Sequence, residues 1–229
     1  MIPSPLGAGQ LNDVIPPAVL LRLQQLDYFI AENPKAARAL LKRAGMPRPL
    51  LTIRIERYDH NTPPAAIDSL LDPVAAGTDA GVISEAGCPA LADPGAILVR
   101  RAHERGLRVV PLTGPSSIVL ALIASGLESQ RFAFHGYLPV KPPERDQAIR
   151  AIESRSRKDR ETQIFIETPY RNARLLDALL SVCQPGTLLC IAAELTLPGE
   201  TVHTRPIADW KRGKPDLADR PTVFLLLAR

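Results

Sequence analysis

Apolar and polar positions follow two different periodicities along the first half of the chain. Short apolar runs rich in β-branched residues are separated by segments with helical periodicity, which is typical of parallel strands joined by crossover helices. The strands are predicted at residues 27–31, 51–55, 80–84 and 107–111, and the helices at residues 17–25, 34–44, 65–75 and 96–105. The expected first strand is very short or truncated, since only Met1 and Ile2 precede the turn-like residues 3–7.

The second half opens with an apolar helix and then changes character. Residues 113–117 lead into a helix over residues 118–124 that ends at Gly126, with proline near its start and glycine at its end. Further strands are predicted at residues 132–134, 163–167, 187–193 and 222–227, and helices at residues 143–157 and 170–182. We therefore expect an α/β protein with two α/β domains: residues 1–113 with a parallel sheet, and residues 114–229 with a mixed sheet.

Composition places the chain among ordinary globular proteins, with 45% apolar and 23% charged residues in 229. No uninterrupted apolar run reaches the roughly 20 residues of a membrane span, and the first residues do not resemble a secretory signal. We therefore expect a cytoplasmic protein without a membrane partner. The three cysteines contain no C-x-x-C pair and the four histidines share no ligand spacing, so we expect neither disulfides nor a metal site.

Positive charge is concentrated in one part of the first half. The formal charge is only +4, but residues 35–57 carry seven basic side chains against Glu56 alone. Such a stretch is either a solvated surface or a surface that contacts the phosphate backbone of a nucleic acid.

Two loops that follow predicted strands are candidate ligand sites. Residues 84–95 and 111–117 are rich in small residues, glycine and proline, and each lies between the carboxyl end of a strand and the start of a helix. There, backbone N–H and C=O groups are available to a ligand such as adenine, ribose or a carboxylate. A purely structural turn is the alternative. Gly7-Ala8-Gly9 gives only weak support for a dinucleotide fold, because Asn12 stands where the third glycine would be.

Five motifs in order resemble the tetrapyrrole methylase superfamily over almost the whole chain. Within it, the chain looks most like the branch of small-subunit ribosomal RNA (cytidine-2'-O)-methyltransferases. The motifs are residues 84–95 (SEAGCPALADPG), 111–117 (PLTGPSS), 132–139 (FAFHGYLP), 165–171 (FIETPYR) and 194–196 (ELT). The resemblance implies an S-adenosylmethionine-dependent methyltransferase, usually a homodimer, which binds its cofactor in a cleft between two α/β domains.

Carried over residue by residue, the resemblance names the cofactor-binding positions. Three loops of the first domain and a wall from the second would contribute. These positions are Pro5, Leu6, Gly7, Cys88, Pro89, Leu91, Ser116, Ser117, Phe165, Ile166, Ala193 and Glu194. Cys88 would be a loop residue near the cofactor and not a nucleophile.

A ribose hydroxyl must lose a proton when it is methylated, so a carboxylate is expected nearby. Our candidates are Glu167, Glu85 and Glu32, in that order. Glu167 and Arg171 could instead form an ordinary ion pair at the end of a strand. The chain departs from the branch's usual pattern at Asn33, Glu85 and Leu197, all at polar positions that would face the cleft.

Three functions remain open at this stage. RNA is the preferred acceptor because of the basic stretch at residues 35–57. A tetrapyrrole or another small molecule is an alternative acceptor, because acidic macrocycles also favour basic clefts. The departures at Asn33, Glu85 and Leu197 would also fit a cofactor-binding homologue that has lost catalysis.

Overall fold

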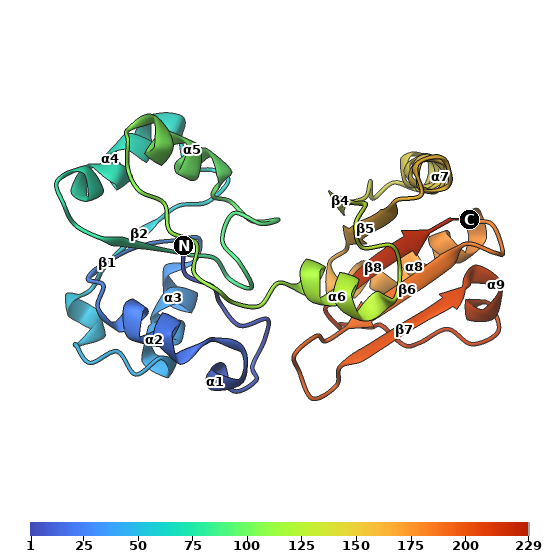
Figure 1. Ribbon diagram of the computed structural model, residues 1–229, viewed down its shortest axis with the longest axis horizontal. Helices are drawn as coiled ribbons and strands as arrows, with labels where there is room; N and C mark the ends of the chain where they lie inside the picture. Colours follow the sequence, from blue (N-terminus) through green and yellow to red (C-terminus); the bar gives the residue numbers. More distant parts are fainter. Residues whose placement is uncertain (229) are drawn as a thin grey trace. The chain divides into compact units, whose positions relative to one another are not determined.

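The computed structural model describes residues 1–228 and divides the chain between Ser116 and Ser117 into two compact units. Each has its own sheet (Figure 1). The sheet of the first unit contains three parallel strands in the order β2-β1-β3, and that of the second contains five mixed strands in the order β4-β5-β8-β6-β7. The predicted α/β class is therefore confirmed.

The first unit has helices on both faces of its sheet. The strands are β1 (Tyr28–Ala31), β2 (Arg54–Arg57) and β3 (Ala80–Ile83). Side chains alternate along β1, so that Phe29 packs against α1, α2 and α3 while Tyr28 packs against α4 and α5. The helices are α1 (Leu11–Val14), α2 (Pro17–Gln24), α3 (Pro34–Arg43), α4 (Pro64–Ala75) and α5 (Ala96–Glu104), with a 3-10 turn, η1 (Leu50–Thr52), before β2.

The amino-terminal segment adds two isolated bridges to the free edge of β3. Ile2 pairs in parallel with Ile83, and Ser4 pairs in antiparallel with Gly87. The expected strand at residues 107–111 was wrong, because these residues form no ladder. Their segment shares only two backbone hydrogen bonds with Met1. Prolines at positions 3, 5 and 111 lack the N–H groups that would extend the pairing.

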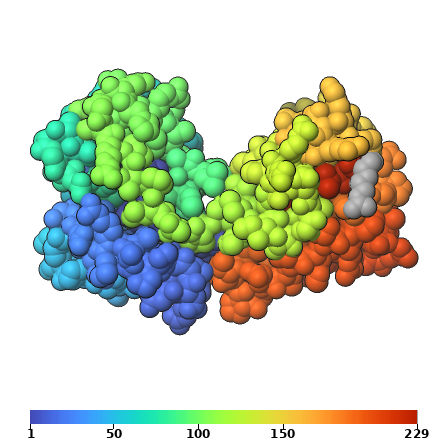
Figure 2. All heavy atoms as spheres, in the orientation of Figure 1, coloured from blue at the N-terminus to red at the C-terminus, as the bar shows by residue number. Residues whose placement is uncertain are grey.

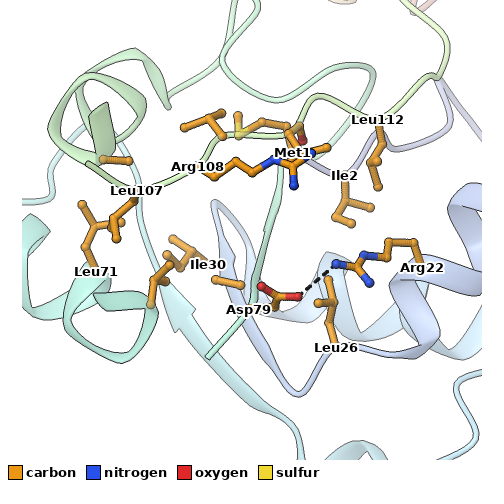
Figure 3. A pocket seen from close by; sticks show the side chains of 15 residues that line it. Met1, Ile2, Arg22, Leu26, Ile30, Leu71, Asp79, Leu107, Arg108 and Leu112 are labelled. Carbon is orange, nitrogen blue, oxygen red and sulfur yellow. Dashed lines mark hydrogen bonds and ion pairs between the residues drawn. The ribbon is translucent and has the colours of Figure 1, made fainter. Parts of the chain in front are cut away.

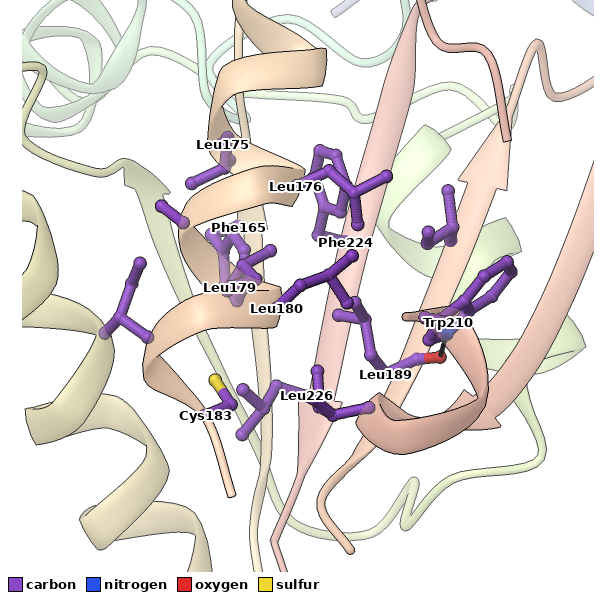
Figure 4. Close-up of a cluster of buried hydrophobic side chains, with 14 of the residues drawn as sticks. Phe165, Leu175, Leu176, Leu179, Leu180, Cys183, Leu189, Trp210, Phe224 and Leu226 are labelled. Atoms are coloured by element: carbon purple, nitrogen blue, oxygen red, sulfur yellow. Dashed lines mark hydrogen bonds between the residues drawn. The ribbon is translucent and has the colours of Figure 1, made fainter. Parts of the chain in front are cut away.

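The second unit encloses the larger hydrophobic core. Its strands are β4 (Phe132–Tyr137), β5 (Thr162–Ile166), β6 (Leu188–Ala193), β7 (Thr201–Pro206) and β8 (Thr222–Leu227). One face packs against α7 (Pro142–Asp159), α8 (Asn172–Val182) and α9 (Ile207–Trp210), and a 3-10 turn, η2 (Pro169–Arg171), precedes α8. Figure 4 shows Phe165 and Phe224 from neighbouring strands among the leucines of α8. Their rings stack with centroids 5.9 Å apart.

The helix α6 (Ser117–Ser125) packs on the sheet through residues that contact β6, β7 and β8. It lies at the surface of the second unit in Figure 2. Val119 and Ile123 on its outer side are 48% and 73% exposed, although the helix is apolar almost throughout. None of the helices within residues 1–228 combines the length and apolar character needed to cross a membrane.

Candidate functional site

Three loops predicted to bind cofactor meet at the carboxyl end of β3 in the first unit. Ser4 forms a two-way backbone pair with Gly87, at 2.8 and 3.1 Å, and its hydroxyl donates to the Ser84 carbonyl at 2.8 Å. The Cys88 thiol points to the Pro115 carbonyl at 3.5 Å. The loops at residues 5–7, 88–91 and 114–116 are thus tied together mainly by backbone groups.

Glycine makes this close approach possible at Gly114. A Cβ atom there would overlap the ring of Pro3, so only glycine lets the third loop lie against the first. Gly95 likewise allows a close backbone approach within the second loop, because a Cβ atom at position 95 would lie only 2.6 Å from the Cβ of Ala90. Ala90 and Ala92 both adopt left-handed backbone conformations, with φ of 67° and 65°. Such strain in alanine is uncommon and gathers at ligand-binding loops.

A hollow of about 320 Å³ opens beside the first loop. Pro5, Leu6 and Gly7 line one side and Glu85 another, and residues of α3 complete it. The structure therefore brings the first loop together with one predicted catalytic carboxylate. Cys88, Pro89 and Leu91 do not line this hollow, although Leu91 is 40% exposed in the same loop.

Carboxylates gather where β1 and β3 end. Glu32 follows β1, Glu85 follows β3, and Asp93 approaches from the second loop. Burial raises the pKa of Glu32, and the charges of Asp93 and Glu85 raise it further, while a hydrogen bond from the Glu85 backbone opposes them. Burial likewise raises the pKa of Asp93, although a hydrogen bond with Ser84 lowers it.

Asn33 and Glu85, two of the departures from the family pattern, are hydrogen-bonded to each other. The Asn33 side-chain amide donates to the Glu85 carboxylate at 2.7 Å. The same side chain accepts from the Lys35 and Ala36 backbone N–H groups and so caps α3. Asn33 therefore links the start of α3 to the end of β3. Glu85 itself is exposed.

Cys88 is placed as a neutral loop residue. Burial raises the pKa of its thiol, which faces the carbonyls of Gly114 and Pro115. A nucleophilic cysteine needs the opposite shift. This geometry agrees with the expectation that Cys88 is not a nucleophile.

The predicted cofactor residues of the second unit differ in how far they are buried. Phe165 and Ala193 are fully buried in its core, so their side chains have no surface to offer a ligand. Ile166 and Glu194 are partly exposed at the ends of the same strands. Ser116 and Ser117 lie on either side of the division between the two units.

Glu167 is tightly held after β5. Its Oε1 accepts from Arg171 at 2.6 Å, from the Thr168 backbone N–H at 2.6 Å and from the Thr168 hydroxyl at 3.2 Å. The Glu167 side chain is only 6% exposed. All three donors bond Oε1, and the ion-pair interpretation describes the observed geometry of Glu167.

Glu194 after β6 is also paired. Its Oε2 accepts from the Arg220 guanidinium at 2.8 Å, and Arg220 also donates to the Gly199 carbonyl at 2.7 Å. Glu194 itself has a left-handed backbone, with φ of 53°. The sequence pattern did not indicate Arg220, which is 26 residues away from its partner. Asp93 was missed as well, although it lies inside the quoted motif.

Within residues 1–228, the seven basic side chains of residues 35–57 divide into four that bond to neighbouring groups and three that do not. Arg48, Arg54 and Arg57 form ion pairs with nearby acids, and Arg43 donates to the Gly9 carbonyl at 2.6 Å. The remaining three, Lys35, Arg38 and Lys42, are exposed on α3. Their spacing places them along one side of the helix. None of these three has a hydrogen bond or ion pair from its side chain within the described residues.

A second hollow, of about 140 Å³, lies at the other end of β3 (Figure 3). Asp79 and Arg22 form an ion pair at its rim, and apolar side chains such as Leu26 and Leu71 line it. Ligands of parallel α/β sheets bind at the carboxyl ends of the strands. This hollow stands at the amino end of β3 and is not our candidate site.

Comparisons with known proteins show similarity over most of the chain. The family model of Tetrapyrrole (Corrin/Porphyrin) Methylases matches residues 6–210. "Ribosomal RNA small subunit methyltransferase I" of Escherichia coli O157:H7 is 35% identical over 91% of this chain and 69% of the relative. The protein of the same name from Xylella fastidiosa (strain Temecula1) is 36% identical over 85% and 67%.

A solved structure shows the same fold at low sequence identity. The crystal structure of the methyltransferase CobJ matches with a TM-score of 0.62 and 20% identity, over 94% of this chain and 89% of CobJ. The family model covers most of the chain, and several relatives exceed 30% identity over most of both sequences. The chain therefore belongs to the family of tetrapyrrole (corrin/porphyrin) methylases, and is a methyltransferase that uses S-adenosylmethionine as its methyl donor.

Proposed function

We propose that this enzyme methylates a ribose 2'-hydroxyl of small-subunit ribosomal RNA. The observation that carries the proposal is the agreement among its relatives. Proteins named "Ribosomal RNA small subunit methyltransferase I" from several bacteria are 31–36% identical to it over 85–95% of the chain. Such an acceptor also implies a cytoplasmic location.

The row of Lys35, Arg38 and Lys42 on α3 supports an RNA acceptor. These cations are exposed and available to phosphates, and α3 lines the hollow beside the first loop. Phosphate contacts of this kind give nucleic-acid binding most of its salt dependence. The basic stretch therefore supplies three candidate phosphate contacts, which is fewer than its seven cations suggest.

The loops of the first unit suit an adenosyl cofactor. They offer backbone groups, small side chains and a neutral thiol, and a flat uncharged ring needs such surroundings. We propose that Pro5 to Gly7, Cys88, Pro89, Leu91 and Ser116 contact it. For Ser117, Ile166 and Glu194 of the second unit, a cofactor contact stays a prediction from the family resemblance. Phe165 and Ala193 would support those positions from the core. The bound cofactor supplies a sulfonium methyl that is already activated for transfer.

Glu32 is the carboxylate best placed to take the ribose proton. It is partly buried at the end of β1, and its raised pKa makes it a stronger base than an ordinary glutamate. Glu85 lies beside it and is oriented by Asn33. We propose that the 2'-hydroxyl proton passes to the Glu32 carboxylate as the ribose oxygen bonds the methyl carbon. The sulfur–methyl bond of the cofactor would break in the same step, with its electron pair staying on sulfur in the leaving S-adenosylhomocysteine. The paired Glu167 then has a positioning role through Arg171.

We also propose that the enzyme is a homodimer. Val119 and Ile123 on the outer side of α6 support this, because a helix that is apolar on all sides is normally buried. Changing Ile123→Glu should halve the mass measured by light scattering. A wild-type chain that is monomeric at micromolar concentration would contradict the proposal.

The test of the proposed reaction is methyl transfer to isolated small-subunit RNA from labelled S-adenosylmethionine. We expect label on a ribose 2'-oxygen, and RNA binding that weakens steeply as salt rises. Changing Lys35, Arg38 and Lys42 together to glutamine should reduce the slope of log binding constant against log salt concentration by about two to three, the value expected for two to three lost phosphate contacts.

The matched control changes Arg150, Lys158 and Arg160 to glutamine. These three cations are exposed on and after α7, so the change in net charge is the same. The control should retain the wild-type salt dependence. Label that appears on a tetrapyrrole but never on RNA would contradict the proposed acceptor.

A further inference from the structure

Two exposed tyrosines lie at one end of the second unit's sheet. Tyr137 ends β4 and Tyr170 lies in η2, just after β5, and the two strands are neighbours (Figure 1). Tyr137 pairs with Ile166 in the ladder between the two strands, and Tyr170 follows Ile166 by four residues. Their side chains are 56% and 70% exposed. Large aromatic rings are usually covered, so two exposed at one edge point to a binding surface.

Arg171 joins these rings. Its guanidinium carbon lies 5.4 Å from the centre of the Tyr170 ring, within the range of a cation–π contact. The hydrogen bond to Glu167 is the main cause that raises the pKa of Arg171, and Tyr170 and Tyr137 add smaller electrostatic contributions. Because Glu167 holds Arg171 at 2.6 Å, the guanidinium is fixed beside the Tyr170 ring.

Two further cations lie close in sequence to the tyrosines. Lys141 follows Tyr137 by four residues, and Arg174 follows Tyr170 by four residues on α8. Both are exposed, and neither side chain forms a hydrogen bond or ion pair within residues 1–228. The one carboxylate in contact with Arg171, that of Glu167, is already neutralised by it. The surroundings of the two rings are therefore suited to an anion with flat uncharged parts.

We propose that Tyr137 and Tyr170 form a stacking surface for unpaired bases of the RNA acceptor, with Arg171 holding the rings in place. Single-stranded RNA presents splayed bases that stack on aromatic rings and arginine planes. Lys141 and Arg174 would contact the neighbouring phosphates. This inference rests on the proposed function and extends it, because it assigns RNA contacts to the second unit in addition to those of α3.

The test uses a short single-stranded oligoribonucleotide with 2-aminopurine next to a cytidine. Stacking on tyrosine quenches the fluorescence of 2-aminopurine. Tyr170→Ala and Tyr137→Ala should each weaken binding about 5- to 100-fold and reduce the quenching, while Tyr170→Phe and Tyr137→Phe keep both. Affinity for S-adenosylmethionine, measured by calorimetry, should stay unchanged and shows that each variant is folded.

Phe132→Ala is the matched control. Phe132 is 47% exposed on the same strand as Tyr137, but at its opposite end. Loss of this ring should change RNA affinity less than twofold. An equal loss in Phe132→Ala and Tyr137→Ala would mean that any exposed ring on β4 matters, and would overturn the proposed surface.

The remaining outcomes separate this inference from the proposed function. If the wild-type enzyme methylates RNA but the alanine variants bind it normally, the stacking surface is wrong and the function stands. If the wild type neither binds nor methylates RNA, both fail. A fall in mass of the alanine variants by light scattering would assign the tyrosines to a contact between subunits and overturn the proposal.

Discussion

The two units differ in how much of each sheet is buried. In the first unit only β1 is buried along its whole length, and β2 is exposed or half-exposed throughout. In the second unit β5, β6 and β8 are buried almost from end to end. The candidate catalytic and cofactor loops of the first unit are held by backbone contacts and close glycines. The second unit thus provides the larger core, and the first provides most of the adaptable ligand-binding backbone.

The largest expected effect is on the second unit's core. Phe224→Ala removes a fully buried ring that stacks on Phe165, and should lower the free energy of unfolding by about 3–5 kcal/mol. Trp210 is the single tryptophan and is buried in the same core, so its fluorescence during urea unfolding reports on the second unit. Phe29→Ala in the first unit should leave that transition almost unchanged. An equal shift in both variants would show that the units unfold as one.

The next effect concerns the carboxylates of the first unit. Glu32→Gln should lower the methylation rate by at least about 100-fold if Glu32 accepts the ribose proton. In the wild type, activity should rise with pH as Glu32 loses its proton, above the usual range of glutamate because its pKa is raised. Glu85→Gln removes a neighbouring negative charge, so the rise should move to lower pH.

Glu104→Gln serves as the control for these carboxylates, since Glu104 is exposed on α5 and pairs only with Arg101 there. Its pH profile should match that of the wild type. The rise of activity with pH should persist in Glu167→Gln and disappear in Glu32→Gln. The opposite result would identify Glu167 as the base.

A smaller effect is expected where the loops touch. Gly114→Ala places a methyl group against Pro3 and should push the third loop from the first, weakening S-adenosylmethionine binding about tenfold by calorimetry. Trp210 fluorescence should report the normal unfolding of the second unit. Gly186→Ala is the control, because a Cβ there meets nothing within 4 Å. Unchanged cofactor affinity in Gly114→Ala would separate this contact from the cofactor site.

The smallest effect is expected at Cys88. Cys88→Ala removes a weak thiol contact with a carbonyl, and methylation should stay within about twofold of the wild type. Because burial raises the pKa of the thiol, alkylation by iodoacetamide at pH 8 should be slower than that of a free cysteine. Complete loss of methyl transfer would restore a chemical role for this residue.

The strands predicted from the apolar pattern overlap every strand of the two sheets within residues 1–228 except β7. Buried β-branched and aromatic residues marked β1, β3, β5, β6 and β8. The edge strand β7, Thr201–Pro206, was missed because alternate polar residues such as His203 and Arg205 face solvent. Residues 107–111 have the composition of a strand but lack a partner with free N–H groups, which pattern alone does not reveal.

The sequence predicted loops of the candidate site better than the hydrogen bonds and ion pairs between its side chains. The sequence placed the loop at residues 84–95 correctly after a strand, β3, whereas the loop at residues 111–117 follows no strand. The motifs raised the Glu167–Arg171 ion pair only as an alternative, and they did not reveal that Asn33 bonds Glu85 across 52 residues or that Arg220 bonds Glu194. Those contacts depend on the tertiary fold, and they reorder the carboxylates that the sequence ranked.

The prolines of the amino-terminal segment also protect the sheet of the first unit. Ile2 and Ser4 donate their amide hydrogens to the carbonyls of Val82 and Gly87 at the β3 edge, whereas Pro3 and Pro5 have none to donate. A foreign strand that approached this segment from outside would find no regular row of donors to pair with. This edge of the sheet, on the side of β3, is thereby protected from edge-to-edge aggregation.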